Sequence, residues 1–291
     1  MKRGFLLDDS AISPIIGFAL VLAILVTTLG FLQQHFVPVW NAQVELDQFE
    51  KVSSDMKLFT STVSSVAATG SPQTSTINMG LRFPSRAILY NPKPSVFGRL
   101  TTDILNVSIN YTTNSGLQTI KNYTSSTIIF ELDGVAQHPK LVYEHGILIK
   151  DYSAYGQPNF TAEQSISFIS GSDIYIPILI TNTTRKDEIS ITPVQKKIFQ
   201  TPNSDSDPVY LAIPSKVIVT LETHYPDSWI ELLPKEESTN IGVYRVNNAI
   251  IIEETITQKT QIYLPKNSSD MLMQSDTLYS GLASLKSEPG I

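Results

Sequence analysis

The sequence predicts an α+β membrane-anchored protein, in which an N-terminal transmembrane helix and a helical stalk precede a mainly antiparallel β-sandwich. Three patterns predict this class: an uncharged apolar run near the N-terminus, a heptad-like repeat behind it, and many short strand-like segments after residue 70. The chain of 291 residues is long enough to bury a core. Only 16% of its residues are charged, below the ~25% typical of soluble domains.

The composition excludes several classes of function. The net charge is −6 and no basic stripe is visible, so nucleic-acid binding has no electrostatic support. The chain has no cysteine, which excludes disulfides, thiolate metal sites, cysteine nucleophiles and lipid attachment through cysteine.

We expect the transmembrane helix at residues 11–36, behind a cytoplasmic leader at residues 1–10. No charged residue other than histidine occurs from Ser10 through Val44. A helix from Pro14 to Phe36 would span ~35 Å, enough for a hydrocarbon layer of ~30 Å. Ser13 is suited to cap this helix, and Pro14 to its first turn, where a missing N–H costs nothing.

The basic residues predict the orientation of the span. Lys2 and Arg3 precede it, and no lysine or arginine follows until Lys51. The positive-inside rule then places the N-terminus in the cytoplasm and everything after residue 36 outside the cell membrane. The alternative is an ordinary secretory signal, but no small-residue cleavage pattern follows Leu32, so a retained span is favoured.

Residues 37–69 form the expected stalk helix, with Pro38 expected to bend or interrupt the helix at its start. Apolar residues recur at alternating steps of three and four, which is a heptad-like seam. They are Phe49, Val52, Met56, Phe59, Val63 and Val66. The seam can pack on the chain's own head domain or on neighbouring subunits, and Gly70-Ser71-Pro72 is expected to end the helix.

The expected β-sandwich covers residues 70–265, and residues 266–291 are expected to be a loose tail. Short runs rich in isoleucine, valine, threonine and tyrosine alternate with turn residues, which indicates an antiparallel fold. These runs are 102–113, 126–132, 146–152, 165–169, 173–181, 188–192, 216–223, 241–246, 249–255 and 260–264. One short helix is expected from Asp227 to Leu233, with Asp227 as its cap and Pro234 ending it.

No residue pattern indicates catalysis, a resident metal or a cofactor. His138 and His145, with Glu144 adjacent, are the nearest approach to a metal pair, and His35 and His224 stand alone. Loop polarity explains these histidines more simply.

Two kinds of acidic pattern in the sequence resemble functional sites but lack their required features. Residues 203–207 alternate oxygen donors like a calcium loop, but Pro208 and Pro214 replace the required glycine and glutamate. The pairs Glu236-Glu237 and Glu253-Glu254 each point to opposite faces of a strand and do not converge. We therefore expect the protein not to be an enzyme.

Candidate N-glycosylation sequons are more frequent than chance predicts, and all follow residue 100. Such sequons suit a surface-exposed, exported segment. They are Asn106, Asn110, Asn122, Asn159, Asn182 and Asn267.

Residues 8–30, DDSAISPIIG followed by FALVLAILVTTLG, closely resemble the N-terminus of archaeal type IV pilin-like proteins. A weaker resemblance, from VPVWNAQVELDQFEKV through LRFPSRAILYNPKP, extends to a large pilin-like family with an extracytoplasmic β-rich region. The resemblance implies a class III signal cut by a prepilin peptidase, here between Ser10 and Ala11, next to the helix-start motif of Ser13, Pro14 and Gly17.

Two alternatives to that cut remain. Gly4-Phe5 imitates the bacterial pilin cleavage site, but Asp8-Asp9-Ser10 and Pro14 then intervene before the helix can begin. The leader can also remain uncut.

The resemblance implies a pilin-like cell-surface protein, with partners in the membrane, the prepilin peptidase and other pilin subunits. Its size favours a minor or associated subunit of a filament, with a structural or adhesive role in the type IV pilus. The alternative is a single-pass anchored binding or sensor protein that never polymerises.

Overall fold

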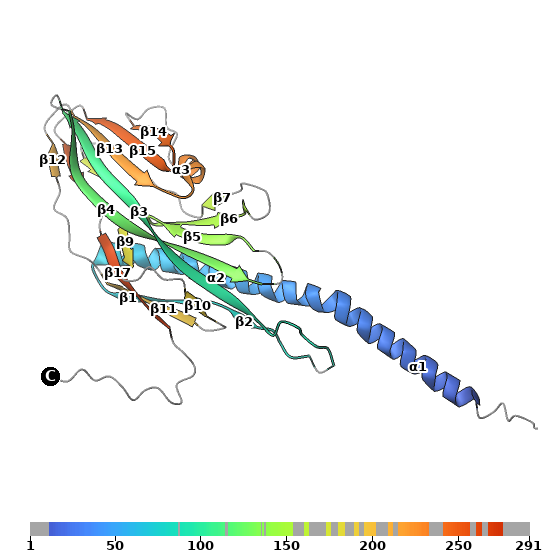
Figure 1. Ribbon diagram of the computed structural model, residues 1–291. Helices are drawn as coiled ribbons and strands as arrows, with labels where there is room; N and C mark the ends of the chain where they lie inside the picture. Colours follow the sequence, from blue (N-terminus) through green and yellow to red (C-terminus); the bar gives the residue numbers. More distant parts are fainter. Residues whose placement is uncertain are drawn as a thin grey trace, which may run out of the picture.

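In the computed structural model the described residues form one long N-terminal helix and a β-rich head (Figure 1). The structure describes residues 12–86, 88–113, 116–134, 136, 138–153, 160–162, 173–175, 180–183, 189–191, 195–201, 209–211, 215–232, 241–256, 260–263 and 267–275.

The first 20 residues of the helix are α1 (Ile12–Phe31), which projects away from the head in Figure 1. Its residues 15–28 are exposed and apolar apart from two threonines, so among the described residues there is one helix long and apolar enough to cross a membrane. Such a helix is a candidate anchor.

The helix continues past Pro38, and the irregularity that the sequence predicts there takes the form of a π-helical stretch. This stretch, η1 (Leu32–Phe36), joins α1 directly to α2 (Val37–Thr69), and Pro38 lies in the first turn of α2. Within η1 the Val37 N–H bonds to the Leu32 carbonyl, five residues back. The wider π turn relieves the proline ring of its usual clash with the preceding turn, so the rod continues past it.

The stalk helix ends where the sequence predicts. Gly70 adopts the left-handed conformation, with φ of 68°, and its N–H bonds to the Val66 carbonyl at 2.9 Å. Glycine carries no Cβ, so it closes the helix without strain.

In the described part of the head, one curled sheet has ten strands and two smaller sheets lie beside it. The longest strands of the main sheet are β3 and β4, which form a hairpin (Figure 1). The expected short strands 102–113 and 126–132 are each only part of one of these. The strands are β1 (Gln73–Asn78), β2 (Leu81–Arg82), β3 (Ser95–Thr113), β4 (Gly116–Asp133), β5 (Lys140–Glu144), β6 (Ile147–Asp151), β7 (Phe160–Ala162), β8 (Asp173–Tyr175), β9 (Ile180–Thr183), β10 (Ile189–Ile191), β11 (Gln195–Thr201), β12 (Val209–Leu211), β13 (Ser215–Glu222), β14 (Ile241–Val246), β15 (Ala249–Ile256), β16 (Thr260–Tyr263) and β17 (Asn267–Ser275).

Pairing is mostly antiparallel, as expected. The main sheet runs β14-β15-β13-β3-β4-β5-β6-β7, with β10 and β2 also pairing β3. The smaller sheets are β1-β11-β17-β9 and β12-β16-β8, and each contains one parallel pair. The expected fold class therefore holds at the level of an N-terminal apolar helix followed by a mostly antiparallel, curled sheet.

The expectation of a loose tail from residue 266 is wrong for its first part. Strand β17 pairs with β11 and β9. Its sequence, NSSDMLMQS, has little period-two alternation and therefore does not look like a strand. The strand still forms, because main-chain hydrogen bonds hold it without requiring any particular side chains. Residues 276–291 lie outside the described part of the chain.

One hydrophobic core lies between α2 and the head. All six seam residues are at most 2% exposed, and all but Val66 belong to this core, with Val96 and Leu100 of β3 and Phe130 of β4. The seam thus packs on the chain's own head, one of the two alternatives that the sequence left open.

A second core lies at the other end of the long hairpin. It contains Val107 and Ile109 of β3 and strands β13 and β15, covered by Trp229. Buried positions of β3 are even-numbered up to Leu100 and odd-numbered from Leu105, so the two halves of the strand bury opposite faces. Beyond Leu105, the even-numbered side chains of β3 therefore face outward.

The short helix α3 (Pro226–Leu232) forms close to its predicted position. Asp227 does not cap it, because the helix begins one residue earlier. The Asp227 carboxylate instead accepts a hydrogen bond from Arg245 at 2.7 Å. Leu233 and Pro234 lie outside the described residues.

Candidate functional site

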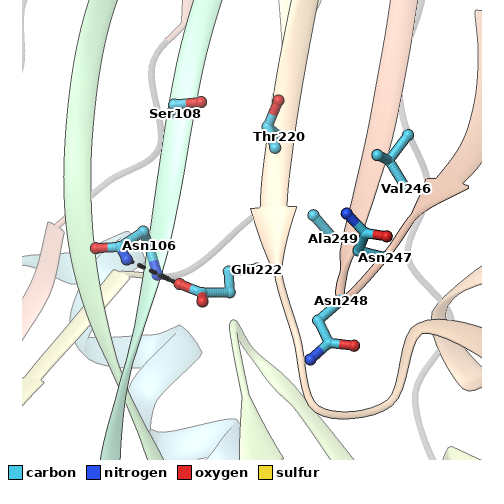
Figure 2. Close-up of a pocket in the computed structure, with 8 residues that line it drawn as sticks. All are labelled: Asn106, Ser108, Thr220, Glu222, Val246, Asn247, Asn248 and Ala249. Atoms are coloured by element: carbon cyan, nitrogen blue, oxygen red, sulfur yellow. Dashed lines mark hydrogen bonds between the residues drawn. The ribbon is translucent and has the colours of Figure 1, made fainter.

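The outward face of the second half of β3 carries a hollow (Figure 2). Its volume is about 380 Å³, and its floor spans β3, β13 and the β14–β15 turn. Its lining residues are Asn106, Ser108, Thr220, Glu222, Val246, Asn247, Asn248 and Ala249. We call this hollow the outer groove.

A doubly hydrogen-bonded pair forms one wall of the outer groove. One oxygen of the Glu222 carboxylate accepts from the backbone N–H of Asn106 at 2.9 Å and from its Nδ2 at 2.8 Å (Figure 2). The two residues lie on neighbouring antiparallel strands, with Leu221 opposite Val107. Hydrogen bonds to an ionised acceptor are the stronger kind, so the pair fixes this edge of the groove.

The opposite wall is the β14–β15 turn. Asn247 adopts the left-handed conformation, with φ of 54°, which asparagine tolerates better than most residues. The Arg245 guanidinium donates to the Asn247 carbonyl at 2.9 Å and to Asp227 on α3. Helix α3 thereby holds the turn in place.

A second hollow of about 410 Å³ lies on the other side of Asn106 and Ser108. Asn122, Tyr123 and Thr124 of β4 complete its lining. The two hollows together present amides, hydroxyls and one carboxylate beside apolar side chains such as Val246 and Ala249. The polar groups can exchange hydrogen bonds with a polar ligand.

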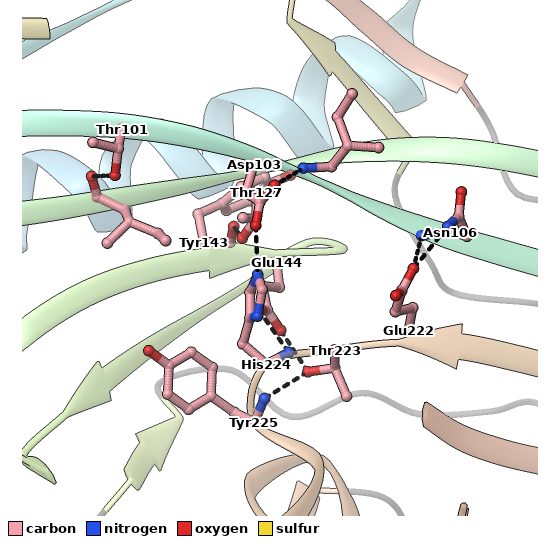
Figure 3. Close-up of polar contacts among 12 residues, drawn as sticks. Thr101, Asp103, Asn106, Thr127, Tyr143, Glu144, Glu222, Thr223, His224 and Tyr225 are labelled. Atoms are coloured by element: carbon pink, nitrogen blue, oxygen red, sulfur yellow. Dashed lines mark hydrogen bonds and ion pairs between the residues drawn. The ribbon is translucent and has the colours of Figure 1, made fainter. Parts of the chain in front are cut away.

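A buried polar cluster lies behind the outer groove, around Glu144 at the end of β5 (Figure 3). Its carboxylate is fully buried and accepts from the Thr223 hydroxyl at 2.6 Å, the His224 N–H at 3.3 Å and Trp229 Nε1 at 3.4 Å. Thr223 and His224 belong to the β13–α3 connection, and Trp229 belongs to α3 itself. The cluster therefore fixes α3, and through it the groove wall, onto the β5–β6 hairpin.

His145 forms the adjoining turn and is also buried. Its Nε2 lies 2.9 Å from the Glu222 carbonyl, and because a carbonyl only accepts, Nε2 carries the proton. Burial lowers the pKa of His145 below its usual range, so the ring is neutral near pH 7.

Tyr225 and Asp151 close the cluster on its other side. The Tyr225 hydroxyl donates to the Asp151 carboxylate at 2.9 Å. Burial, and then the neighbouring Asp151 charge, raise the pKa of Tyr225 well above its usual value, so the phenol stays protonated. A protonated phenol keeps donating to Asp151, so this hydrogen bond has a structural role.

The expected cleavage residues Ser10 and Ala11 lie outside the described part of the chain. Ser13, Pro14 and Gly17 all lie in α1. The helix already includes Ile12, so Ser13 lies inside its first turn and does not precede it as a cap. Pro14 is in the first turn as expected, where N–H groups have no partner within the helix.

Three of the six sequons gather on one outward surface. Asn106 and Asn110 lie four residues apart on β3, with Ser108 between them. Asn122 of β4 lies opposite Ser108. Asn106 and Asn122 are exposed, and Asn110 donates to the Ser108 hydroxyl at 3.3 Å. Asn182 lies on β9 and Asn267 on β17, whereas Asn159 lies outside the described residues.

The structure does not bring His138 and His145 together. His138 Nε2 lies 3.4 Å from the Glu45 carboxylate of α2, His145 contacts Glu222, and His224 lies 3.3 Å from Asp103 (Figure 3). His35 contacts Phe31 within the helix. Within the described ranges no group of three or more histidine, aspartate or glutamate side chains could hold a metal ion.

The other acidic patterns have different outcomes. The calcium-like stretch 203–207 and Glu236-Glu237 lie outside the described residues. Glu253 forms an ion pair with Lys216 and accepts from the Tyr244 hydroxyl at 2.6 Å. These contacts lower the pKa of Glu253, mainly through Lys216. Glu253 therefore ties β15 to its neighbours β13 and β14.

Sequence reasoning missed two structurally central carboxylates, Glu45 and Glu222, and named Glu144 only as the neighbour of a candidate metal pair. A signal existed for Glu45, because it lies four residues before Phe49 and extends the apolar seam by one step. No comparable signal existed for the roles of Glu144 and Glu222. Their hydrogen-bond partners lie 77 to 116 residues away in the sequence.

Comparison with known proteins gives one informative match. An uncharacterised protein of Archaeoglobus fulgidus is 30% identical over 148 residues, which cover 50% of this chain and 26% of that protein. The match therefore spans about a quarter of the relative's length. No family model and no solved structure matches the chain.

Proposed function

We propose that this protein is a pilin-like cell-surface protein, held by α1 in the membrane or in a filament core, with the head outside the cell. One observation carries the proposal: α1 and α2 form a single rod whose apolar end is unburied and whose other end is packed into the head. The exposed apolar side chains of α1 would gain ~25 cal/mol for each Å² removed from water, in lipid or in a helix bundle.

The resemblance of residues 8–30 to archaeal pilin-like N-termini supports a class III leader cut between Ser10 and Ala11 by a prepilin peptidase. The head is large for a repeating filament subunit. We therefore favour a minor or associated subunit with a structural or adhesive role, and no enzymatic activity. The outer groove would be the adhesive surface, because its amides, hydroxyls and carboxylate suit a polar ligand.

The second candidate is an anchored binding or sensor protein that never polymerises. The burial of the stalk seam favours it, since that seam is used up within one chain and gives no apolar surface to a neighbour. In this candidate α1 serves only as a single-pass anchor.

Two measurements separate these candidates. The mass and N-terminal sequence of the protein from its native cells should show a chain beginning at Ala11, and a chain beginning at Met1 would contradict a processed pilin. Shearing the cells should release the protein in filaments for the first candidate. Retention of all of it in the membrane fraction favours the second.

A further inference from the structure

The loop between β2 and β3 spans residues 83–94 and is described at 83–86 and 88–94, where it is fixed against the helix at the end of the apolar run. The Gln33 side chain pairs with the backbone of Tyr90: Nε2 donates to the Tyr90 carbonyl at 2.5 Å, and Oε1 accepts from the Tyr90 N–H at 3.0 Å. Two turns further along, Asn41 donates to Asn91 at 3.0 Å and accepts from Arg86 at 3.3 Å. The loop therefore has a defined height along the rod, and Figure 1 shows it projecting from the head toward α1.

The tip of this loop exposes apolar side chains. Ile88 is 77% exposed and Tyr90 is 74% exposed, more than any other large hydrophobic residue in the described part of the chain. On the helix at the same level, Phe36 and Trp40 are also exposed, and the Arg86 guanidinium lies 5.0 Å from the Trp40 ring centroid. Tyrosine and tryptophan beside a cation match the side chains that concentrate at a membrane–water interface, and isoleucine favours the hydrocarbon next to it.

The height of the tip fits that interface. From Ile12 to Gln33 the helix rises ~32 Å at 1.5 Å per residue, close to the ~30 Å hydrocarbon thickness. Gln33 therefore marks the outer edge of the hydrocarbon layer. Tyr90 is hydrogen-bonded to Gln33 and lies at the same level. Residues 15–28 are all exposed, whereas Leu29, one turn below Gln33, is partly covered.

The charge around the loop also suits a membrane surface. No aspartate or glutamate occurs between Asp55 and Asp103, although the whole chain has a net charge of −6. Within that interval Arg86 and Lys93 lie on the loop itself. Lys93 is paired with Asp133 at 3.5 Å, so Arg86 is the cation that lies beside the apolar tip. Basic residues beside an apolar patch favour contact with anionic headgroups.

We propose that the tip of the 83–94 loop, with Ile88 and Tyr90, inserts into the headgroup–acyl boundary of the outer leaflet beside α1. This inference rests on the proposed function, because it requires α1 to cross the bilayer. A span alone permits rotation and tilt of the head, and a second lipid contact on one side restricts both. The head would then stand on the membrane in one orientation.

The absence of cysteine makes the depth of single residues measurable. Four variants of the full chain, each with one cysteine, would carry a nitroxide spin label: Ile88→Cys, Tyr90→Cys, Leu22→Cys in the middle of α1, and Leu117→Cys at the β3–β4 turn. Each is reconstituted in vesicles of phosphatidylcholine and phosphatidylglycerol. Collisions with apolar oxygen and with a water-soluble nickel chelate then report lipid and water around the label. All four native side chains are at least 50% exposed, so labels should leave the fold intact, which circular dichroism checks.

The expected result is a severalfold higher ratio of oxygen to nickel collisions at 88 and 90 than at 117, with the highest ratio at 22. Ratios at 88 and 90 equal to that at 117 would overturn the inference while leaving the anchor intact. Low access to both reagents with spin–spin broadening would mean that a second copy covers the tip, which also overturns it. A water-exposed label at 22 would contradict the membrane span itself, and the inference with it.

Discussion

Glu45 of the stalk helix and His138 of the β4–β5 connection approach to 3.4 Å, with both side chains almost fully buried. The same carboxylate oxygen accepts from the Ala136 N–H at 2.8 Å. This contact joins elements more than 90 residues apart and ties the middle of the rod to the head.

The first prediction concerns this junction. Glu45→Ala leaves the Ala136 N–H and the His138 ring without their acceptor in a buried place, so we expect a loss of about 2–4 kcal/mol in the free energy of unfolding. Glu50→Ala, at an exposed position on the same helix, should change it by less than about 0.5 kcal/mol. Urea unfolding of the full chain in detergent measures both, and equal effects would show that Glu45 does not hold the junction.

The stalk seam gives the second prediction. Met56 is fully buried between helix and sheet, whereas Leu58 is 61% exposed on the same helix. Met56→Ala should cost about 2–5 kcal/mol, because it removes buried methylenes and leaves a cavity. Leu58→Ala should cost almost nothing. A Met56→Ala protein of unchanged stability that fails only in assembly would instead indicate that the seam binds a neighbour.

Gly98 gives the third prediction. A Cβ at this position would overlap the Met79 carbonyl and the Phe130 ring, and backbone cannot move aside as a side-chain end can. Gly98→Ala should therefore lower the free energy of unfolding by about 3 kcal/mol, as severe overpacking does. If the protein is only marginally stable, this change should abolish the expression of folded protein. Gly242→Ala is the matched control, since its Cβ would meet only the Glu253 carbonyl at 4.0 Å. Expression yield and melting temperature distinguish the two.

Acid sensitivity from His145 is the fourth prediction. Its pKa is lowered in the folded state, so the unfolded chain binds this proton more readily than the folded one. Stability from this group is complete above the unfolded pKa of about 6.5 and falls as the pH drops below it, by at most about 1.4 kcal/mol per pH unit.

The variant His145→Asn tests this origin. His145 has φ of 47° and precedes Gly146, and Asn-Gly suits such a turn, so the variant should fold. Its unfolding midpoint should vary less than that of the parent between pH 5.5 and 7.5. An unchanged pH profile would assign the acid sensitivity to other groups.

The fifth prediction concerns the clustered sequons. The Asn106 amide is held by Glu222, whereas Asn122 is exposed on the neighbouring strand. We expect higher glycan occupancy at Asn122 than at Asn106 in protein from the native cells, measured by mass spectrometry of glycopeptides. Glu222→Gln weakens the hold on Asn106 and should raise its occupancy. Equal occupancy in the parent protein would count against control by this hydrogen bond.

The sequence predicts the rod better than it predicts the head. Helical periodicity is local, so the seam from Phe49 to Val66 and the stop at Gly70 can be read directly from neighbouring residues. The length of β3 could not be read this way. Its buried face changes between Leu100 and Leu105, which interrupts the period-two pattern and makes one strand resemble a short one.

The candidate site was hidden for a related reason. Asn106 attracts notice as a sequon, but its partner Glu222 is 116 residues away and looks like an ordinary strand end. A polar groove on the outside of a sheet has no apolar signature, and its geometry depends on which strands become neighbours. Only the pairing of β3 with β13 reveals it.

The π-helical stretch at Leu32–Phe36 shifts the sequence by one residue between the two halves of the rod. It holds one more residue than α-helical turns of the same height. The extra residue is taken up within the wide turn, so each residue after Phe36 faces the direction that its predecessor would face in an unbroken α-helix. Deleting one residue from this stretch would restore ordinary α-helical turns and leave the direction of the head about α1 nearly unchanged, whereas the same deletion within α1 would turn the head through about 100°.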